Sequence, residues 1–170
     1  MDTINQKNEA AARHIYLPIA EGEIRLIRLH AAAPDGPIAC SLLPTPQSTA
    51  PSYEALSYVW GSQQHSYPIS LNGYAFHVTQ NLFQALRYLR LPTADRLLWV
   101  DALAIDQGND AEKSEQVLLM HTIYSGGKET IAWLGEGDEH VDAAICFFCL
   151  RTVSKERSVL AEDTRPRSRR

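Results

Sequence analysis

The sequence predicts an α/β domain with a mainly parallel central sheet flanked by helices. After residue 53, apolar segments of strand length alternate with segments of helical periodicity, which implies right-handed crossovers between parallel strands. The run at residues 97–105 is apolar except for Asp101, as in a strand that is covered on both faces. The chain has 170 residues, of which 45% are hydrophobic, and can therefore bury the core of one compact domain.

An antiparallel strand pair is predicted ahead of this alternating region. Residues 23–30 (EIRLIRLH) alternate apolar and charged side chains and predict a strand, although the alternation breaks at Leu26 and Ile27. Residues 38–43 predict its antiparallel partner, because the Pro-Asp-Gly-Pro sequence at 34–37 favours a turn between them.

A further strand and a β-hairpin come next. Residues 53–60 predict a strand that ends at a glycine. Residues 68–78 predict the hairpin, since Asn72 and Gly73 supply the positive φ angles that a type I′ turn requires.

Two helices are predicted from apolar residues that recur at helical spacing. Thr79 is the expected N-cap of the first helix, which Pro92 ends. Asn109 and Glu112 have the spacing of a capping box, which opens the second helix. Two glycines, Gly126 and Gly127, end it. The apolar stripe expected on the second helix consists of Val117, Met120, Ile123 and Tyr124.

The C-terminal part predicts a short buried strand at residues 130–134 and a helix at residues 141–153. Residues 154–170 are polar and arginine-rich, which predicts a basic, disordered tail. Residues 1–15 are polar and predict a flexible N-terminus. We therefore expect a single domain over residues 16–153.

The composition excludes several functional classes. A net charge of −4 argues against general nucleic-acid binding, which favours a basic surplus. There is no secretory signal, and no apolar run approaches the roughly 20 residues that span a bilayer, so we expect a cytoplasmic protein without a membrane span. The three cysteines, Cys40, Cys146 and Cys149, are expected to be reduced thiols rather than disulfides. Cys146 and Cys149 have C-x-x-C spacing in an apolar helical stretch and are expected to be packed rather than to serve a redox or metal role.

Three sequence blocks carry a family resemblance. They are residues 53–61 (YEALSYVWG), residues 98–107 (LWVDALAIDQ) and residues 112–135, which begin with Glu112-Lys113 and end with IAWLG. Their order and spacing resemble the heterokaryon-incompatibility (HET) domain of filamentous fungi. Several long motifs in register are much more specific than one short pattern.

The resemblance implies a signalling module of fungal self/non-self recognition, or allorecognition, that leads to programmed cell death. The HET domain is similar to the TIR domain of innate-immunity receptors, so the resemblance also implies a TIR-like or flavodoxin-like fold. Some TIR domains cleave NAD with a single glutamate. Under this analogy Glu112 is the candidate catalytic residue, and NAD is a substrate rather than a bound cofactor.

Two positions depart from the family pattern. Ala104 stands where the family usually has cysteine, and Asp106 stands where it usually has asparagine. The alanine removes any chemistry that the cysteine performs. The aspartate adds a charge at a strand end and puts the family's ligand-binding role in doubt.

Candidate ligand-binding residues follow from the rule that parallel α/β sheets bind ligands at the carboxyl ends of their strands. The rule selects Ser57, Trp60, Gly61, Asp101, Asp106 and Gln107. The indole of Trp60 can stack on a flat ring, and Gly61 allows close approach of the backbone. A carboxylate such as Glu112 can stabilise positive charge that develops on a ribose.

Structural roles compete with each of these assignments. Glu112 satisfies a capping box without any catalysis, and Asp101 can pair with Arg87 or Arg96. The tryptophans can be core residues. A hydrolase triad at Ser57 is disfavoured because no G-x-S-x-G motif surrounds it. No metal site is predicted, because the histidines are scattered and H-E-x-x-H is absent.

Three functional hypotheses remain open. The first is an interaction module that self-associates or binds a protein partner. The second is an NAD-cleaving enzyme with a nucleotide ligand. The third is a truncated, inactive family member, which the short chain and residues 104 and 106 favour.

Overall fold

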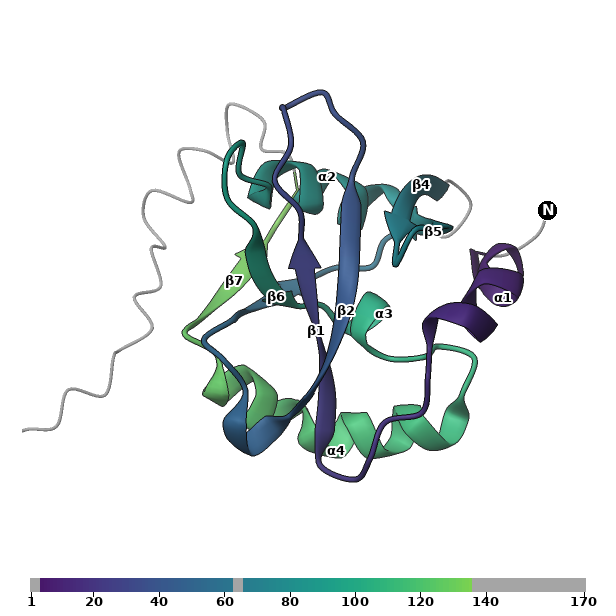
Figure 1. The fold of residues 1–170 in the computed structure, drawn as a ribbon, viewed down its shortest axis with the longest axis vertical. Helices are drawn as coiled ribbons and strands as arrows, with labels where there is room; N and C mark the ends of the chain where they lie inside the picture. The colour runs from purple at the N-terminus through teal and green to yellow at the C-terminus, as the bar shows by residue number, and fades with distance from the viewer. Residues whose placement is uncertain (1–3, 63–65, 136–170) are drawn as a thin grey trace, which may run out of the picture.

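The computed structural model describes residues 4–62 and 66–135, which form a seven-stranded mixed sheet and four α-helices (Figure 1). The strands are β1 (Glu23–Leu29), β2 (Ala39–Pro46), β3 (Glu54–Tyr58), β4 (Ser66–Leu71), β5 (Tyr74–Thr79), β6 (Arg96–Trp99) and β7 (Glu129–Trp133). The helices are α1 (Ile4–Ile15), α2 (Gln80–Leu89), α3 (Asp101–Ala104) and α4 (Asp110–Gly126), with a 3-10 turn, η1, at Gln47–Thr49. The expected α/β class is confirmed.

The expectation of a mainly parallel sheet is wrong. The strand order is β5-β4-β2-β1-β6-β3-β7. Pairs β1–β2, β1–β6 and β4–β5 are antiparallel, whereas β2–β4, β3–β6 and β3–β7 are parallel. Parallel pairing therefore dominates only the β6-β3-β7 end, because the N-terminal strand pair is inserted into the sheet between β4 and β6.

Burial on both faces explains why β1 lies inside the sheet. Residues 24–27 are all buried, and β2 and β6 flank the strand on its two sides. Side chains of a strand point to alternate faces, so apolar residues at both Leu26 and Ile27 cover both faces. The break in alternation that the sequence shows at this point is thus the mark of a central strand.

The predicted local signals for the hairpin and the helix starts are confirmed. Asn72 and Gly73 have φ angles of 50° and 84°, and they join β4 to β5 as a type I′ turn requires. The hydroxyl of Thr79 accepts a hydrogen bond from the Leu82 amide at the start of α2. The side chain of Asn109 accepts one from the Glu112 amide at the start of α4.

The predicted strand at residues 97–105 is only partly correct. β6 ends at Trp99, and residues 101–104 form the helical turn α3. Asp101 Oδ1 accepts a hydrogen bond from the Ala102 amide, at 2.7 Å, and thereby supports the start of the turn. Alanine and leucine at the next positions favour helix over strand.

The predicted apolar stripe of α4 is confirmed at Met120, Ile123 and Tyr124, which pack in or against the core, and is wrong at Val117. Val117 is 57% exposed, whereas Gln116 is buried and Ile123 is fully buried. Glu112, Gln116, Met120 and Ile123 therefore share the inner face, at the spacing of neighbouring helical turns. The Gln116 amide group donates to the carbonyl of Glu23 at 3.0 Å, which accounts for a polar residue on this face.

The strand at residues 129–133 exists, but it lies at an edge of the sheet instead of being buried. Among the described residues β7 pairs only with β3, and Glu129, Thr130 and Ala132 are exposed. Trp133 is its single buried residue.

Residues 4–15 form the helix α1 where the sequence led us to expect a flexible segment. α1 covers β5, at the opposite edge of the sheet from β7 (Figure 1). Asn8 makes two hydrogen bonds with the backbone of His77, at 2.7 and 2.8 Å. The Asn8 side chain thus satisfies a backbone N–H and a carbonyl on the edge strand β5 that a neighbouring strand would otherwise pair. The expected helix at 141–153, the expected tail at 154–170 and the thiols Cys146 and Cys149 lie outside the described residues.

Candidate functional site

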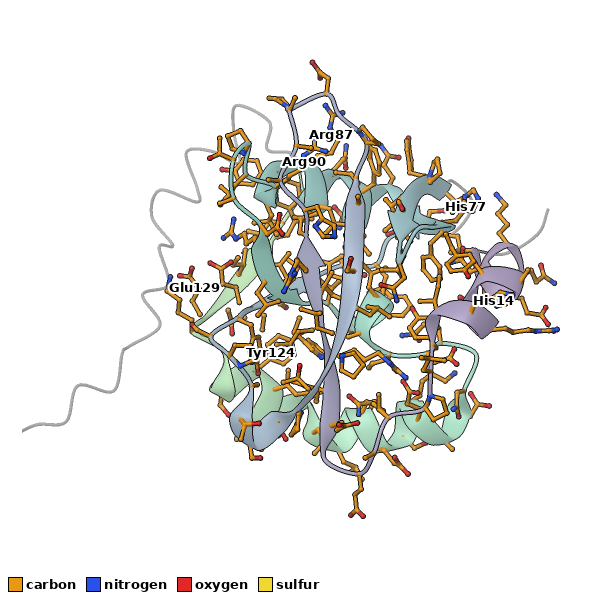
Figure 2. All side chains as sticks on the ribbon, in the orientation of Figure 1. His14, His77, Arg87, Arg90, Tyr124 and Glu129 are labelled. Atoms are coloured by element: carbon orange, nitrogen blue, oxygen red, sulfur yellow. The ribbon has the colours of Figure 1, made fainter. Side chains whose placement is uncertain are left out.

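A cavity of about 270 Å³ lies between α1, β5, the end of β3 and the loop at residues 106–108. Its lining includes Tyr16, Tyr58, Trp60, His77, Asp106 and Gln107. Figure 2 places His77 on the side of β5 where α1 and His14 lie. Three of the residues selected by the strand-end rule, Trp60, Asp106 and Gln107, thus border one cavity.

Asp101 lies directly behind the aromatic wall of this cavity. Its Oδ2 accepts a hydrogen bond of 2.8 Å from the indole nitrogen of Trp60, and the hydroxyl of Tyr58 also donates to its carboxylate. The side-chain amide of Gln107 donates to the Asp101 carbonyl at 3.1 Å. Asp101 therefore fixes three of the side chains that border the cavity.

The environment of Asp101 raises the pKa of its carboxyl group. Burial is the main cause, and the hydrogen bonds from Trp60, the Ala102 amide and Tyr58 offset it only in part. Burial, followed by the negative charge of Asp101, raises the pKa of the Tyr58 hydroxyl.

The arginine partners considered for Asp101 are engaged elsewhere. Arg96 forms an ion pair with Glu54, and Arg87 approaches Asp35 at 3.5 Å. The ion pair with Arg96 is the largest cause of a lowered pKa at Glu54. Neutral donors and a backbone amide, rather than a cation, hold Asp101 in the structure.

Glu112 does not line the cavity. Its two carboxylate oxygens meet the guanidinium of Arg25 at 2.5 and 3.1 Å, and the two side chains are only 10% and 1% exposed. Glu112 Oε1 also accepts a hydrogen bond from the Asp106 amide at 2.9 Å. In a full capping box the Asn109 amide would donate a hydrogen bond to the Glu112 carboxylate; here the carboxylate makes these contacts instead, and the Asn109 amide donates to the Asp106 carbonyl.

Arg25 makes Glu112 part of a larger network. The guanidinium also donates to the carbonyls of Leu17 and Ala104, at 2.7 and 3.1 Å, and stands 5.2 Å from the centre of the Tyr16 ring. One buried cation thus ties α4 to β1 and to the loop after α3. This geometry favours the structural role of Glu112 over the catalytic one.

Ser57 and Gly61 lie apart from the cavity. Ser57 is exposed on β3 and pairs in register with Ala132 of β7. Gly61 has a φ angle of 73°, a left-handed conformation that favours glycine, and it turns the chain after Trp60.

Tyr58 and Tyr16 are two of the residues at this site that were not selected from the sequence. Tyr58 could have been found, because strand alternation places Tyr58 and Trp60 on the same face of the chain after Leu56. Tyr16, whose hydroxyl donates to the Leu103 carbonyl at 3.1 Å, gives no comparable signal. Its position depends on how α1 packs, and this is set by contacts between distant segments.

The class of protein that the fold and the cavity define is an α/β domain with a small-molecule-sized hollow at the strand ends. Within residues 4–62 and 66–135, no group of three or more histidine, cysteine, aspartate or glutamate side chains is arranged to hold a metal ion. Of the helices described, none combines the length and the apolar character needed to cross a bilayer.

Comparisons with known proteins identify the family. The family model described as heterokaryon incompatibility protein (HET) matches residues 53–169. Heterokaryon incompatibility protein 6, OR allele, of Neurospora crassa is 36% identical to this chain over 148 residues, which cover 79% of the chain. The chain belongs to the HET family. It spans only 22% of the length of that relative. No solved structure matches it.

Proposed function

We propose that the chain is a HET-domain signalling module of fungal self/non-self recognition. In this role it relays a signal for programmed cell death by self-association or by binding a protein partner. Family membership and the similarity to heterokaryon incompatibility protein 6 support a role in vegetative incompatibility. We also expect the module to act in the cytoplasm.

The position of Glu112 is the observation that carries the proposal. The carboxylate that the TIR analogy selects for catalysis is held by Arg25 and by the Asp106 amide, and it is not among the residues that line the cavity. A buried carboxylate in a two-point contact with arginine is costly to release, because it leaves both charges unpaired. The geometry thus favours a module that acts through its surface.

The outer face of α4 is a suitable surface for such contacts. Val117 and Leu118 are 57% and 82% exposed, and both follow the buried Gln116. Adjacent exposed apolar residues favour association because contact removes them from water.

The experiment is forced clustering of the chain in fungal cells with cell death as the readout. We expect the wild-type chain to cause cell death when it is clustered. Without forced clustering, we expect Leu118→Asp to cause less cell death than wild type. Glu115→Lys, at an exposed site of the same helix, is the matched control and should behave like wild type. Equal responses from all three proteins would remove α4 from the proposal, and no death from clustered, folded protein would refute it.

NAD cleavage is the second candidate, and the cavity favours it. Aromatic side chains of Tyr58 and Trp60 beside Asp106 and Gln107 can stack on a flat ring and hydrogen-bond its sugar. The TIR-like fold assignment supports this candidate only by analogy, through the parallel β6-β3-β7 strands. Glu112 would have to leave Arg25 to act on a ligand there.

NAD turnover by the purified, clustered chain tests this candidate. Turnover that is lost in a folded Glu112→Gln variant would support catalysis by Glu112. Turnover that persists in Glu112→Gln but is lost in Gln107→Ala would locate the reaction in the cavity. Absence of both turnover and cell death in folded protein would favour the inactive family member, for which Ala104 and Asp106 are the candidate causes.

A further inference from the structure

Three large apolar side chains lie exposed where β3 and β7 end. Val59 follows β3, Leu134 follows β7 and Tyr88 is on α2; they are 72%, 71% and 77% exposed. Tyr58 and Trp133 pair in register, so the residues that follow them begin as neighbours. The Tyr88 ring centre lies 5.3 Å from that of Trp133. We name Val59, Tyr88 and Leu134 the strand-end apolar patch.

A hollow of about 350 Å³ adjoins this patch, and Tyr88 and Trp133 are among its lining residues. Arg87 and Arg90 also border it, towards the end of α2 (Figure 2). The guanidinium of Arg90 holds the loop at residues 34–37, because it donates to the carbonyls of Pro34, Gly36 and Pro37. The hollow therefore presents mainly ring and aliphatic surfaces, which suit an apolar side chain.

The sequence supplies an apolar segment immediately beyond the patch. Residues 141–150 (VDAAICFFCL) are apolar at every position except Asp142. A predicted helix that is apolar on all sides requires burial. Only five residues separate Gly135 from Val141, and an extended linker of that length reaches up to about 20 Å. The chain leaves β7 through Leu134, which itself belongs to the patch.

Family membership links the patch and the segment. The HET family model matches residues 53–169 as one stretch, so it includes Val59, Tyr88, Leu134 and the apolar segment. The patch and the apolar segment thus belong to one family domain, and Leu134 of the patch lies seven positions before Val141 in the chain.

We propose that residues 141–150 dock on the strand-end apolar patch of the same chain, with the ring of Phe147 or Phe148 in the hollow beside Trp133. This inference does not depend on the proposed function, because it concerns only what covers the patch.

Cysteine alkylation of the full chain tests the docking directly. Cys146 and Cys149 lie in the segment, whereas Cys40 is buried in the core, where burial raises its pKa to about 12. Rates of modification by a water-soluble maleimide are measured for each thiol by mass spectrometry. We expect Cys146 and Cys149 to react at least roughly tenfold more slowly than in unfolded protein.

Substitution of the patch should remove this protection. We expect Tyr88→Ser, and separately Val59→Ser, to speed alkylation of Cys146 and Cys149 roughly tenfold while Cys40 stays protected. Leu118→Ser is the matched control, since Leu118 is 82% exposed on α4, at the other end of the molecule from α2 (Figure 1). Protection of Cys40 in each variant shows that the core is still folded.

Three outcomes would overturn the proposal. Rapid alkylation of Cys146 and Cys149 in folded wild type would mean that the segment is not docked. Protection that survives both patch substitutions would place the segment elsewhere. Protection that disappears on dilution would assign the patch to a second copy of the chain.

Discussion

Two half-buried carboxylates, in two regions of the molecule, are held in opposite ways. Between β1 and α4, Glu112 forms a two-point ion pair with the fully buried Arg25. At the ends of β3 and β6, Asp101 is held by Tyr58, Trp60 and a backbone amide, and no lysine or arginine of residues 4–62 and 66–135 forms an ion pair with it. Neither carboxylate lines the cavity: Asp101 lies behind the Trp60 side chain, and Glu112 lies behind the backbone of Asp106.

The difference indicates which of the two carboxylates is available for proton transfer. The Glu112–Arg25 ion pair is a connector, because the Glu112 carboxylate on α4 binds both the Arg25 guanidinium on β1 and the Asp106 amide after α3. Neutral donors leave the charge of Asp101 uncompensated, so burial raises the pKa of its carboxyl group. A carboxylate in the second situation is closer to exchanging a proton, and this is the property that a functional acid requires.

The largest expected effect is loss of the ion pair. Glu112→Gln should lower the free energy of unfolding by about 3–5 kcal/mol, because it leaves the Arg25 guanidinium buried without a counter-charge. Urea denaturation measures the change, and Glu115→Gln on the exposed face of α4 should stay within about 0.5 kcal/mol of wild type. A loss below about 1 kcal/mol for Glu112→Gln would mean that the pair is not the connector we describe.

A smaller loss is expected at the second carboxylate. Trp60→Phe removes the indole donor to Asp101 and should cost about 1.5–3 kcal/mol, the usual contribution of a hydrogen bond to a charged group. The same urea titration applies, with Tyr88→Phe at an exposed ring as the control. An unchanged free energy of unfolding for Trp60→Phe would show that water replaces the indole.

A substitution at the N-cap of α4 separates the contribution of helix capping to the free energy of unfolding from that of the Glu112–Arg25 ion pair. Asn109→Ala removes the hydrogen bond to the Glu112 amide but leaves the ion pair intact, so we expect a loss of about 1 kcal/mol. Thermal denaturation of this variant beside Glu112→Gln measures both. Equal losses in the two variants would indicate that capping, rather than the ion pair, accounts for the effect of Glu112.

The smallest effect is a dependence on pH at Asp101. A raised pKa in the folded state means that the ionised carboxyl group destabilises the fold at neutral pH. This cost is relieved as the pH falls through the folded-state pKa and is absent below the unfolded-state pKa of about 3.9.

Denaturation of wild type and Asp101→Asn across a pH series measures this dependence. Because other carboxylates titrate equally in both proteins, the difference in unfolding free energy should shift in favour of wild type as the pH falls from 7 towards 4. A shift in the opposite direction would mean that the hydrogen bonds outweigh burial at Asp101.

Local signals in the sequence predicted local structure well. The Asn72-Gly73 turn and the caps at Thr79 and Asn109 follow from backbone chemistry within a few residues, and each is present. The strand-end rule likewise selected Trp60, Asp106 and Gln107, which border one cavity.

Features that depend on distant segments were missed. β1 was expected to belong to an antiparallel strand pair added to the sheet. In the structure, β6, about 70 positions later in the chain, also pairs with β1 on the side away from β2. Gln116 was overlooked as an inner residue of α4 because its partner, the Glu23 carbonyl, is on another element. Arg25 and Glu112 are 87 positions apart, and no pattern within either element predicts their contact.

That separation has a consequence for synthesis of the protein on the ribosome. Arg25 emerges long before Glu112, and at about 10 residues per second the interval is on the order of nine seconds. During this time β1 cannot complete its burial, because its arginine has no counter-charge and β6 has not been made. The nascent N-terminal region therefore stays open to chaperones until α4 has been made, and β7, which pairs with β3, completes the sheet after it.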